Sequence, residues 1–143
     1  MSAVREFMTT DARCIKEDQT LEDAARMMMD LDCGSLPICG DDGKLKGMIT
    51  DRDIVLKCVA AGRNPREMMA RELASGKPHW VDADASVDDA IGIMEQHQIR
   101  RLPVIADHRL VGIISQGDIA RNYSEERVGE LVEHISERHH MPA

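Results

Sequence analysis

The sequence has very few aromatic side chains. Only Phe7, Trp80 and Tyr123 are aromatic, 2% of 143 residues, whereas ten residues are Met. Because Met is flexible and fills irregular gaps, we expect the methionines to take the core space that rings often occupy. With 43% hydrophobic and 31% charged residues, the chain should still form a packed globule, either one domain or two small halves that share a core.

The chain also lacks long apolar runs and an excess of positive charge. No stretch approaches the roughly 20 apolar residues of a membrane-spanning helix, and the N-terminus has no charged-then-apolar signal segment. The formal net charge of −8 argues against nucleic acid or an anionic membrane as the main partner, since both attract basic surfaces. We therefore expect a cytoplasmic protein with no nucleic-acid partner and no membrane partner.

Catalytic and metal-binding patterns are missing as well. The four cysteines form no C-x-x-C pair, so a zinc finger is not expected. Five histidines show no firm ligand spacing such as H-E-x-x-H: His97, His108, His134, His139 and His140. Neither a nucleophile–base arrangement nor a phosphate-binding loop is present. We expect no enzyme, no catalytic residue and no metal site.

What the sequence does contain is a stretch that occurs twice. Residues 47–54 and 112–119 both read Gly, two apolar residues, a hydroxyl, two variable residues, Asp and Ile. The apolar pair predicts the end of a buried strand. The hydroxyl followed three residues later by Asp predicts the start of a helix, where free N–H groups favour an anion. Two such strand-to-helix corners indicate a ligand cleft produced by duplication.

The flanking sequence repeats in the same order. Thr20 and Ser86 are predicted helix N-caps, and each precedes apolar residues at helical spacing, 21, 24, 25 and 28 in one repeat and 87, 90, 91 and 94 in the other. Residues 36–38 and 102–104 each carry a central proline, which predicts an edge strand or an interrupted ladder. Each repeat therefore predicts strand, helix, strand, strand, helix. Gly34 should stop the first of these helices.

These patterns divide the chain into four segments. We assign residues 1–62 to the first unit, 63–70 to a helical linker, 71–123 to the second unit and 124–143 to a C-terminal helix and tail. The linker helix should begin at Asn64-Pro65. In the helix after the first corner, we expect three residues to face inward: Ile54, Val55 and Cys58. The C-terminal helix has one apolar stripe, formed by Val128, Leu131, Val132 and Ile135, which should pack on the module or on a second subunit.

The repeats resemble a pair of CBS (cystathionine-β-synthase-type) domains, an arrangement called a Bateman module. The likeness rests on 36–38, 102–104 and the two signature stretches, and it covers residues 3–123. Residues 36–42 and 50–55 are also similar to stand-alone CBS pairs, the actinobacterial hypoxic response proteins. The resemblance implies an α/β (α+β) fold of two pseudo-symmetric β-α-β-β-α units packed through their sheets, and a homodimer.

The resemblance also implies ligands that contain adenosine, namely AMP, ADP, ATP or S-adenosylmethionine, in two clefts between the units. By motif position, Asp53 and Asp118 would accept hydrogen bonds from the ribose hydroxyls, and Thr50 and Ser115 would contact phosphate. Four apolar residues near the strand starts would sandwich the base: Ile15, Leu36, Val81 and Leu102. An arginine would assist the phosphate, with Arg13, Arg52, Arg100 and Arg101 as the candidates.

The same residues have plainer interpretations. A hydroxyl three residues before an acid is also the capping-box pattern, so both corners could simply start helices, although capping and binding are compatible. Asp51 places a second carboxylate where a phosphate would approach, so we expect the Ser115/Asp118 corner to be the more nucleotide-like. Trp80 could stack on a base, but packing in a core or interface is the favoured role.

Cys14 and Cys39 support a separate hypothesis. If the first two strands of the unit are parallel neighbours, these two thiols come within disulfide-bonding distance. Reduced buried thiols are the favoured alternative in a cytosolic chain. The leading function is a regulatory CBS pair that senses an adenosine nucleotide and acts through an unknown protein partner. The alternative is a stress-associated structural or protein-interaction module without a nucleotide ligand.

Overall fold

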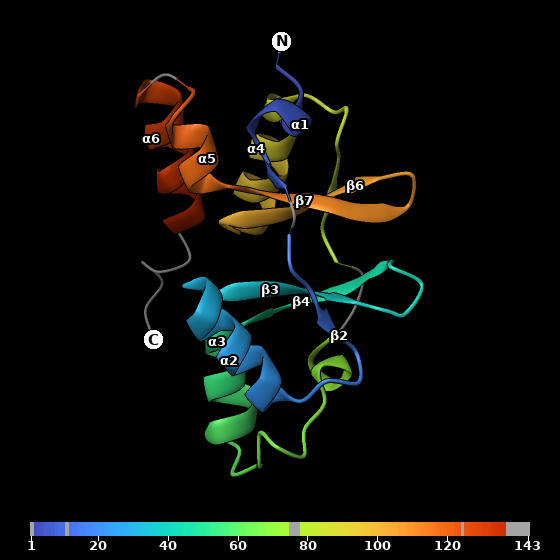
Figure 1. Cartoon of the computed structure of the whole chain (residues 1–143). Coiled ribbons are helices and arrows are strands. Elements are labelled where there is room, and N and C mark those ends of the chain that lie inside the picture. Colours follow the sequence, from blue (N-terminus) through green and yellow to red (C-terminus); the bar gives the residue numbers. More distant parts are fainter. Residues whose placement is uncertain (1, 11, 75–77, 124, 137–143) are drawn as a thin grey trace. The chain divides into compact units, whose positions relative to one another are not determined.

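The two repeats fold into separate units (Figure 1). A computed structural model of the chain describes residues 2–10, 12–74, 78–123 and 125–136. The first-repeat unit is Arg13–Pro78, and the second-repeat unit combines Met1–Ala12 with His79–Ala143. The first-repeat unit is thus one continuous stretch of the chain, whereas the second-repeat unit combines two separate stretches.

The first-repeat unit contains a three-stranded sheet. Its elements are β2 (Ile15–Lys16), α2 (Leu21–Leu31), β3 (Ser35–Cys39), β4 (Leu45–Thr50), α3 (Asp51–Ile54), the π-helix η1 (Val55–Val59) and the 3₁₀-helix η2 (Ala70–Leu73). Strand β3 is central, parallel to β2 and antiparallel to β4. Strand β2 pairs only with Ile38 and Cys39, so Pro37 lies where one side of β3 has no partner strand.

The second-repeat unit contains a four-stranded sheet. Its elements are α1 (Val4–Phe7), β1 (Thr9–Thr10), β5 (Val81–Asp82), α4 (Val87–His97), β6 (Arg101–Ala106), β7 (Arg109–Ser115), α5 (Gln116–Ala120) and α6 (Glu125–Ser136). The strand order is β1-β7-β6-β5. The predicted order of strand, helix, strand, strand, helix is thus confirmed in both repeats.

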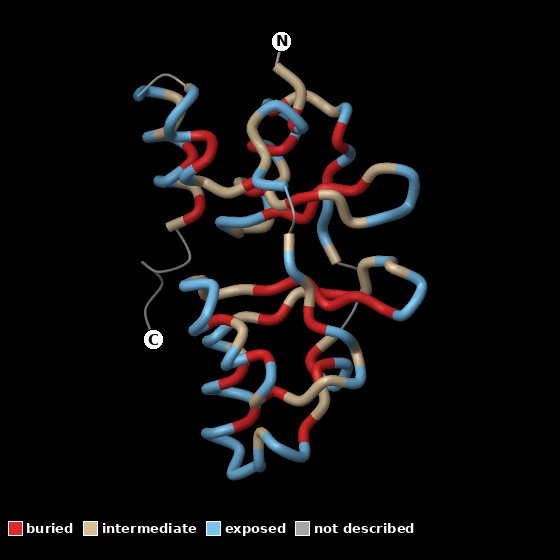
Figure 2. The backbone as a smooth tube through the Cα atoms, viewed as in Figure 1, coloured by how far each residue is buried: buried red, intermediate tan, exposed pale blue. Residues whose placement is uncertain are grey.

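Helices α2 and α4 bury most of the apolar face that was predicted for them. The hydroxyls of Thr20 and Ser86 each accept a hydrogen bond from the backbone N–H three residues later, at 3.1 Å, as expected of N-caps. All four apolar residues of the α4 stripe are buried, whereas in α2 the equivalent Ala25 is exposed. Figure 2 shows the buried segments along the strands and the inner faces of the helices, with exposed residues on the outer faces.

Each repeat is preceded by a short lead-in segment, which contains α1 and β1 before the first repeat and η2 before the second. Each lead-in segment belongs to the unit formed by the other repeat. Val4 N–H donates to Ala85 O at 2.9 Å and Arg5 N–H to Ala83 O at 3.0 Å, which ties α1 to the second repeat. At positions 66 residues later, Ala70 N–H donates to Gln19 O at 2.8 Å and Arg71 N–H to Glu17 O at 3.1 Å. Each lead-in segment therefore hydrogen-bonds to the other repeat, through equivalent bonds.

The first glycine of each signature leaves room for these lead-in segments. A Cβ on Gly112 would lie 2.7 Å from Met8 Sδ and 2.8 Å from Thr9 O. A Cβ on Gly47 would lie 3.0 Å from the Cβ of Ala74. Real Cβ atoms essentially never approach other atoms closer than 3.0 Å, so glycine is needed at position 112, and a Cβ at position 47 would require Ala74 to shift.

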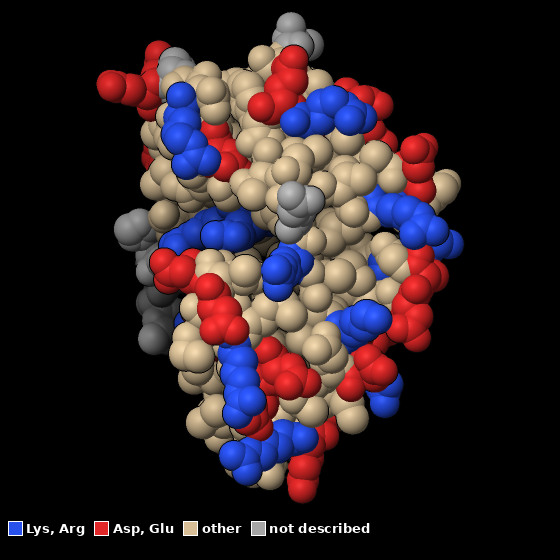
Figure 3. Space-filling model, viewed as in Figure 1, with Lys and Arg blue, Asp and Glu red and all other residues tan. Residues whose placement is uncertain are grey.

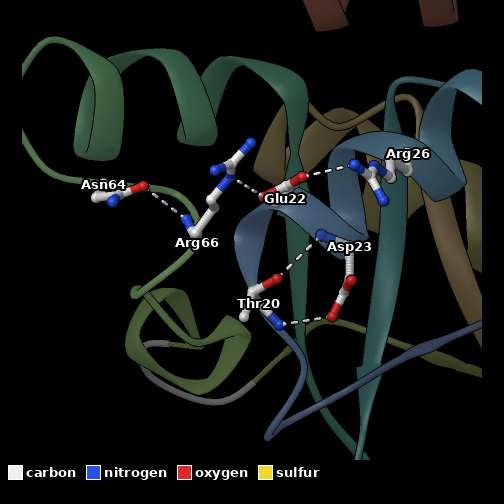
Figure 4. A network of polar contacts seen from close by, with 6 residues as sticks. All are labelled: Thr20, Glu22, Asp23, Arg26, Asn64 and Arg66. Atoms are coloured by element: carbon white, nitrogen blue, oxygen red, sulfur yellow. Dashed lines mark hydrogen bonds and ion pairs between the residues drawn. The ribbon is translucent and has the colours of Figure 1, made fainter.

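The predicted linker helix over 63–70 is wrong, because the structure has a single turn there followed by η2. Glu67 N–H and Met68 N–H both donate to Asn64 O, at 3.0 and 3.1 Å, and no further helical turn follows before η2. Arg66 ties this turn to α2, since its Nε lies 2.9 Å from Glu22, which also pairs with Arg26 of the same helix at 2.7 Å (Figure 4). Backbone bonds add to this link, because Glu22 N–H donates to Pro65 O at 3.1 Å. Tertiary contacts, rather than helix propensity, hold the segment.

Three further expectations at helix ends and faces are tested by the structure. Helix α2 stops at Asp32, which adopts a left-handed conformation (φ 52°), and not at Gly34. Ile54 and Cys58 are buried as expected, but Val55 is exposed, because it is rotated about 100° from Ile54 around the helix. Helix α6 packs on α4 and α5 of its own unit, with Leu131 and Ile135 buried. The expected tail at 138–143 lies outside the described residues.

Candidate functional site

The two strand-to-helix corners have the same hydrogen-bond geometry. At the first corner, Thr50 N–H donates to Asp53 Oδ2 and Asp53 N–H donates to Thr50 Oγ1, both at 3.0 Å. At the second corner, Ser115 N–H donates to Asp118 Oδ2 at 2.9 Å and Asp118 N–H to Ser115 Oγ at 3.1 Å. Both corners are therefore capping boxes. Each box uses the Oδ2 atom of its aspartate, and the Oδ1 atom takes no part in it.

The second carboxylate oxygen faces a basic side chain at both corners. Asp118 Oδ1 lies 2.5 Å from Arg121 Nη2, and Asp53 Oδ1 lies 3.4 Å from Lys57 Nζ. Asp118 is only 4% exposed, and among the described residues it is the one charged residue that is buried. Sequence reasoning missed both bases, although their spacing of three and four residues from the aspartates is a recognisable helical signal.

The strand register places Arg101 beside the second corner. Arg101 on β6 pairs with Ser115 on β7, whereas Ser35 holds the equivalent position opposite Thr50. The Arg101 side chain is exposed and makes no ion pair within the described ranges, and the same is true of Arg13, Arg52 and Arg100. The second corner therefore combines a hydroxyl, a carboxylate and an uncommitted guanidinium, a set that suits an anion and a diol.

The carboxylate of Asp51 is turned toward its own chain. It accepts a hydrogen bond from Arg52 N–H at 2.8 Å, and the space beside Gly34 is filled by its Oδ2 atom. The second repeat has Gln116 at this position, with its N–H bonded to Arg100 O at 2.8 Å. The first corner thus carries one more negative charge near the helix start than the second.

The four residues expected to sandwich a base belong to the hydrophobic cores. Ile15 and Leu36 are buried in the first-repeat unit, and Val81 and Leu102 in the second-repeat unit. Because all four are buried, we assign them a packing role. Their contact with a base stays a prediction. Trp80, which directly precedes β5, is 49% exposed, so it does not pack in the core of its unit.

The cysteines that were considered for a disulfide are both free thiols in direct interaction. A hydrogen bond from the Cys39 thiol lowers the pKa of Cys14 to about 7. The same interaction, together with burial, raises the pKa of Cys39. Cys14 is partly exposed and Cys39 is buried.

A histidine that the sequence analysis did not weigh, His79, stacks on His97. Their ring centroids are 3.6 Å apart and the planes are inclined by 16°. Burial, and then the neighbouring His97, lower the pKa of His79. No sequence signal indicates this pair, because the contact depends on the end of α4 lying beside the start of β5. Across the part of the chain that is described, no three His, Cys, Asp or Glu side chains form a metal-binding group.

Comparison with known proteins decides the family. The model of the CBS domain matches twice, at residues 4–59 and 69–125. The chain belongs to the CBS-domain family. Hypoxic response protein 1 of Mycobacterium tuberculosis is 47% identical over 135 residues, 94% of each chain. Both CBS matches begin in a lead-in segment, in agreement with the exchanged hydrogen bonds of those segments.

Solved structures of CBS proteins show the same fold. The crystal structure of Hypoxic Response Protein I with two coordinated zinc ions has a TM-score of 0.81 and 48% identity, covering 86% of this chain and 100% of that one. The crystal structure of CBSX2 in complex with AMP has a TM-score of 0.72 and 25% identity, covering 85% and 95%. The chain is therefore a CBS-pair protein of the hypoxic response type.

On the visible face of each unit, acidic and basic side chains are intermixed (Figure 3), and the net charge is −8. Broad basic surfaces of the kind that bind nucleic acid are not seen on that face. Within the described ranges, every helix is too short or too polar to cross a membrane.

Proposed function

We propose that this chain is a regulatory, non-enzymatic CBS pair that binds an adenosine-containing ligand at its strand-to-helix corners, chiefly at Ser115 and Asp118. The observation that carries the proposal is the buried Asp118 carboxylate, held by Ser115 N–H and Arg121. An ionised carboxylate accepts hydrogen bonds only, which suits the vicinal hydroxyls of a ribose. The AMP complex of CBSX2 supports the ligand class.

The basic side chains of the second corner favour a phosphorylated ligand over S-adenosylmethionine. Arg101 lies opposite Ser115 in the β-ladder, and Arg121 adjoins Asp118. Guanidinium groups bind phosphate through paired N–H donors, whereas a sulfonium cation would be repelled. We therefore place AMP, ADP and ATP above S-adenosylmethionine as ligands of this corner.

The test is thermal unfolding with each of AMP, ADP, ATP, S-adenosylmethionine and adenosine at millimolar concentration. A ligand that binds only the native state raises the melting temperature by mass action, by an amount equivalent to about 2.7 kcal/mol at 100 times Kd. We expect a rise with the phosphorylated ligands that Asp118→Asn abolishes. Asn keeps an oxygen for the Ser115 N–H bond, so the variant should still fold.

Two matched variants separate the corners. Asp53→Asn removes the equivalent carboxylate of the first corner and should leave most of the rise intact. Arg101→Ser copies Ser35 of the first repeat and should bring the AMP response down to that of adenosine. If no adenosine compound changes the melting temperature of the wild type, the ligand proposal is wrong and the interaction module becomes the better description.

A second candidate function, a protein-interaction module, is favoured by exposed apolar residues on the helices of the first-repeat unit. The group consists of Met29, Leu31, Val55, Leu56 and Val59. In the second-repeat unit, helix α6 packs on the equivalent helices, α4 and α5. We propose that a second copy of the chain covers the uncovered group, forming a homodimer. Val59→Lys should shift sedimentation from dimer to monomer, and Val132→Lys on α6 should not.

Zinc is named for the related Hypoxic Response Protein I, and its fit to this chain can be examined. A structural zinc site takes four ligands, most often Cys and His. The stacked pair of His79 and His97 supplies only two, and the described residues hold no group of three. The described residues alone therefore do not supply the ligands of a structural zinc site.

A further inference from the structure

We propose that Arg121 determines which ligands the second corner accepts, because it closes the Asp118 carboxylate in the free protein and turns to the phosphate of a nucleotide when a ribose takes its place. We call this arrangement the Arg121 latch. The inference rests on the proposed adenosine ligand and adds a residue that selects phosphorylated ligands over adenosine. It concerns side chains of the second-repeat unit alone.

The Asp118 carboxylate is held at both oxygen atoms. Ser115 N–H donates to Oδ2 at 2.9 Å, and Arg121 Nη2 donates to Oδ1 at 2.5 Å. An ionised carboxylate offers about four lone-pair positions, so acceptor capacity remains for the hydroxyls of a ribose. Access is the obstacle, since only 5% of the Asp118 side chain is exposed. A ribose can therefore reach this carboxylate only after one of its present neighbours moves.

Arg121 is the neighbour that is free to move. The N–H group of Ser115 belongs to the backbone at the end of β7, which is held in the sheet opposite Arg101. The Asn122 side chain binds the backbone oxygen of Asp118 and not its carboxylate. Arg121 follows the end of α5, and 70% of its side chain is exposed. Ion pairs of such side chains are weak, because solvent competes for the charge and ordering a long side chain costs entropy.

The first corner has a looser arrangement. Lys57 Nζ lies 3.4 Å from Asp53 Oδ1, and 26% of the Asp53 side chain is exposed. The base also differs in kind, since an ammonium group is a point charge, whereas a guanidinium offers a planar fork of donors that fits a carboxylate or a phosphate equally well. Arg121 can therefore exchange one anion for the other. The carboxylate of the second corner is the one that is both closed and controlled by a phosphate-binding group.

This exchange distinguishes nucleotides from adenosine. Adenosine brings hydroxyls for Asp118 but leaves the displaced guanidinium without a new anion. AMP brings both groups, so the carboxylate and the guanidinium each gain a partner. Removal of the Arg121 side chain should therefore strengthen the binding of adenosine and weaken the binding of AMP. A residue with a purely structural role would change both affinities in the same direction.

The first experiment measures affinities by isothermal titration calorimetry. In Arg121→Ala, Kd for adenosine should fall about fivefold, which corresponds to the loss of one competing ion pair. Kd for AMP should rise about fivefold, because the lost charge-assisted bond to phosphate outweighs the lost competition. Kd for 2′,3′-dideoxyadenosine, which has no ribose hydroxyl, should not change. Arg109→Ala is the matched control, since it removes an exposed arginine at the start of β7 and should bind as the wild type does.

The outcomes separate the latch from the ligand proposal. If the wild type binds AMP but Arg121→Ala binds adenosine no better than the wild type does, the latch is wrong and the adenosine site stands. If both affinities rise equally, Arg121 does not contact the phosphate and the proposed selection is wrong. If neither protein binds any adenosine compound, the proposed function is wrong and the latch falls with it.

The second experiment needs no ligand. Proton–nitrogen NMR detects the Nε–H group of Arg121, which is assigned by its absence from the spectrum of Arg121→Lys. Asp118→Asn removes the charge that holds the guanidinium, so this resonance should move, whereas Asp53→Asn at the first corner should leave it in place. Addition of AMP to the wild type should also move it. A resonance that is the same in Asp118→Asn and in the wild type would overturn the latch, whatever the ligands do.

Discussion

The two repeats end differently, although their corners are alike. In the first repeat, α3 continues into the π-helix η1, which extends the helix to Val59. In the second repeat, α5 ends at Ala120 and the chain turns back into α6, which packs on α4 and α5. The duplication has kept the residues that start each helix and changed those that follow it.

One pair of equivalent positions shows how the difference is encoded. Met29 on α2 is 74% exposed, whereas the side chain of Glu95, 66 residues later on α4, is 19% exposed. Glu95 contacts two residues of α6, with Arg127 Nη1 at 2.5 Å and His134 Nδ1 at 2.9 Å. The charged residue on α4 thus has its ionic partners on α6 of the same chain, whereas the apolar residue on α2 is exposed.

Helix α6 should be the largest energetic difference between the repeats. Leu131 is fully buried, so Leu131→Ala removes apolar contacts and leaves a cavity, which should cost about 3 kcal/mol of the free energy of unfolding. Val132, on the same helix, is 37% exposed, and Val132→Ala should change stability by less than about 0.5 kcal/mol. Urea denaturation measures both. Equal effects would show that α6 contributes little to its unit.

The comparison also shows what the sequence could and could not predict. The element order and the caps at Thr20 and Ser86 follow from local rules, because each depends on residues within one helical turn of one another. The sequence allowed two interpretations of Asp53 and Asp118, capping and ligand binding, and the structure confirms the capping boxes. The position of Asp118 at a helix start can therefore be predicted from the sequence, although the burial of its side chain cannot.

The exchange of lead-in segments was not predictable in the same way. Nothing in the local sequence indicates that each lead-in segment hydrogen-bonds to the other repeat. The helix predicted for the linker, residues 63–70, is wrong for a similar reason. Asn64-Pro65 signals a helix start, yet contacts such as Arg66 with Glu22 decide that only one turn forms. Long-range contacts also place His79 on His97.

The glycines that contact the lead-in segments, Gly112 and Gly47, offer a second way to compare the stability of the two units. In Gly112→Ala the new Cβ would clash with the backbone oxygen of Thr9 at 2.8 Å, and overpacking of this kind should cost about 2 kcal/mol. Gly47→Ala meets Ala74 at 3.0 Å and should cost about half as much. As a control, Gly92→Ala on α4 has nothing within 4 Å and should stabilise the helix by up to about 1 kcal/mol. Chemical denaturation gives the order, and a reversed order for Gly112 and Gly47 would contradict the contact geometry.

The smallest expected difference is the dependence on pH that the stacked pair of His79 and His97 gives to the second-repeat unit. The pKa of His79 is lowered by burial and by His97, so the folded state binds fewer protons than the unfolded state. Its contribution to stability is therefore complete above the ordinary value of about 6.5 and is lost as pH falls through the lower folded value.

His97→Leu copies Leu31 of the first repeat and isolates the charge effect. The variant removes the charge repulsion between His97 and His79 but keeps an apolar side chain beside the His79 ring. The pKa of His79 should therefore rise toward its ordinary value without reaching it. Proton NMR titration of the His79 ring measures this directly, and urea denaturation between pH 8 and pH 5 should show a smaller loss of stability than in the wild type. A His79 pKa that does not move would mean that burial alone lowers it, and the stacked pair would then differ from its first-repeat counterpart in packing and not in charge.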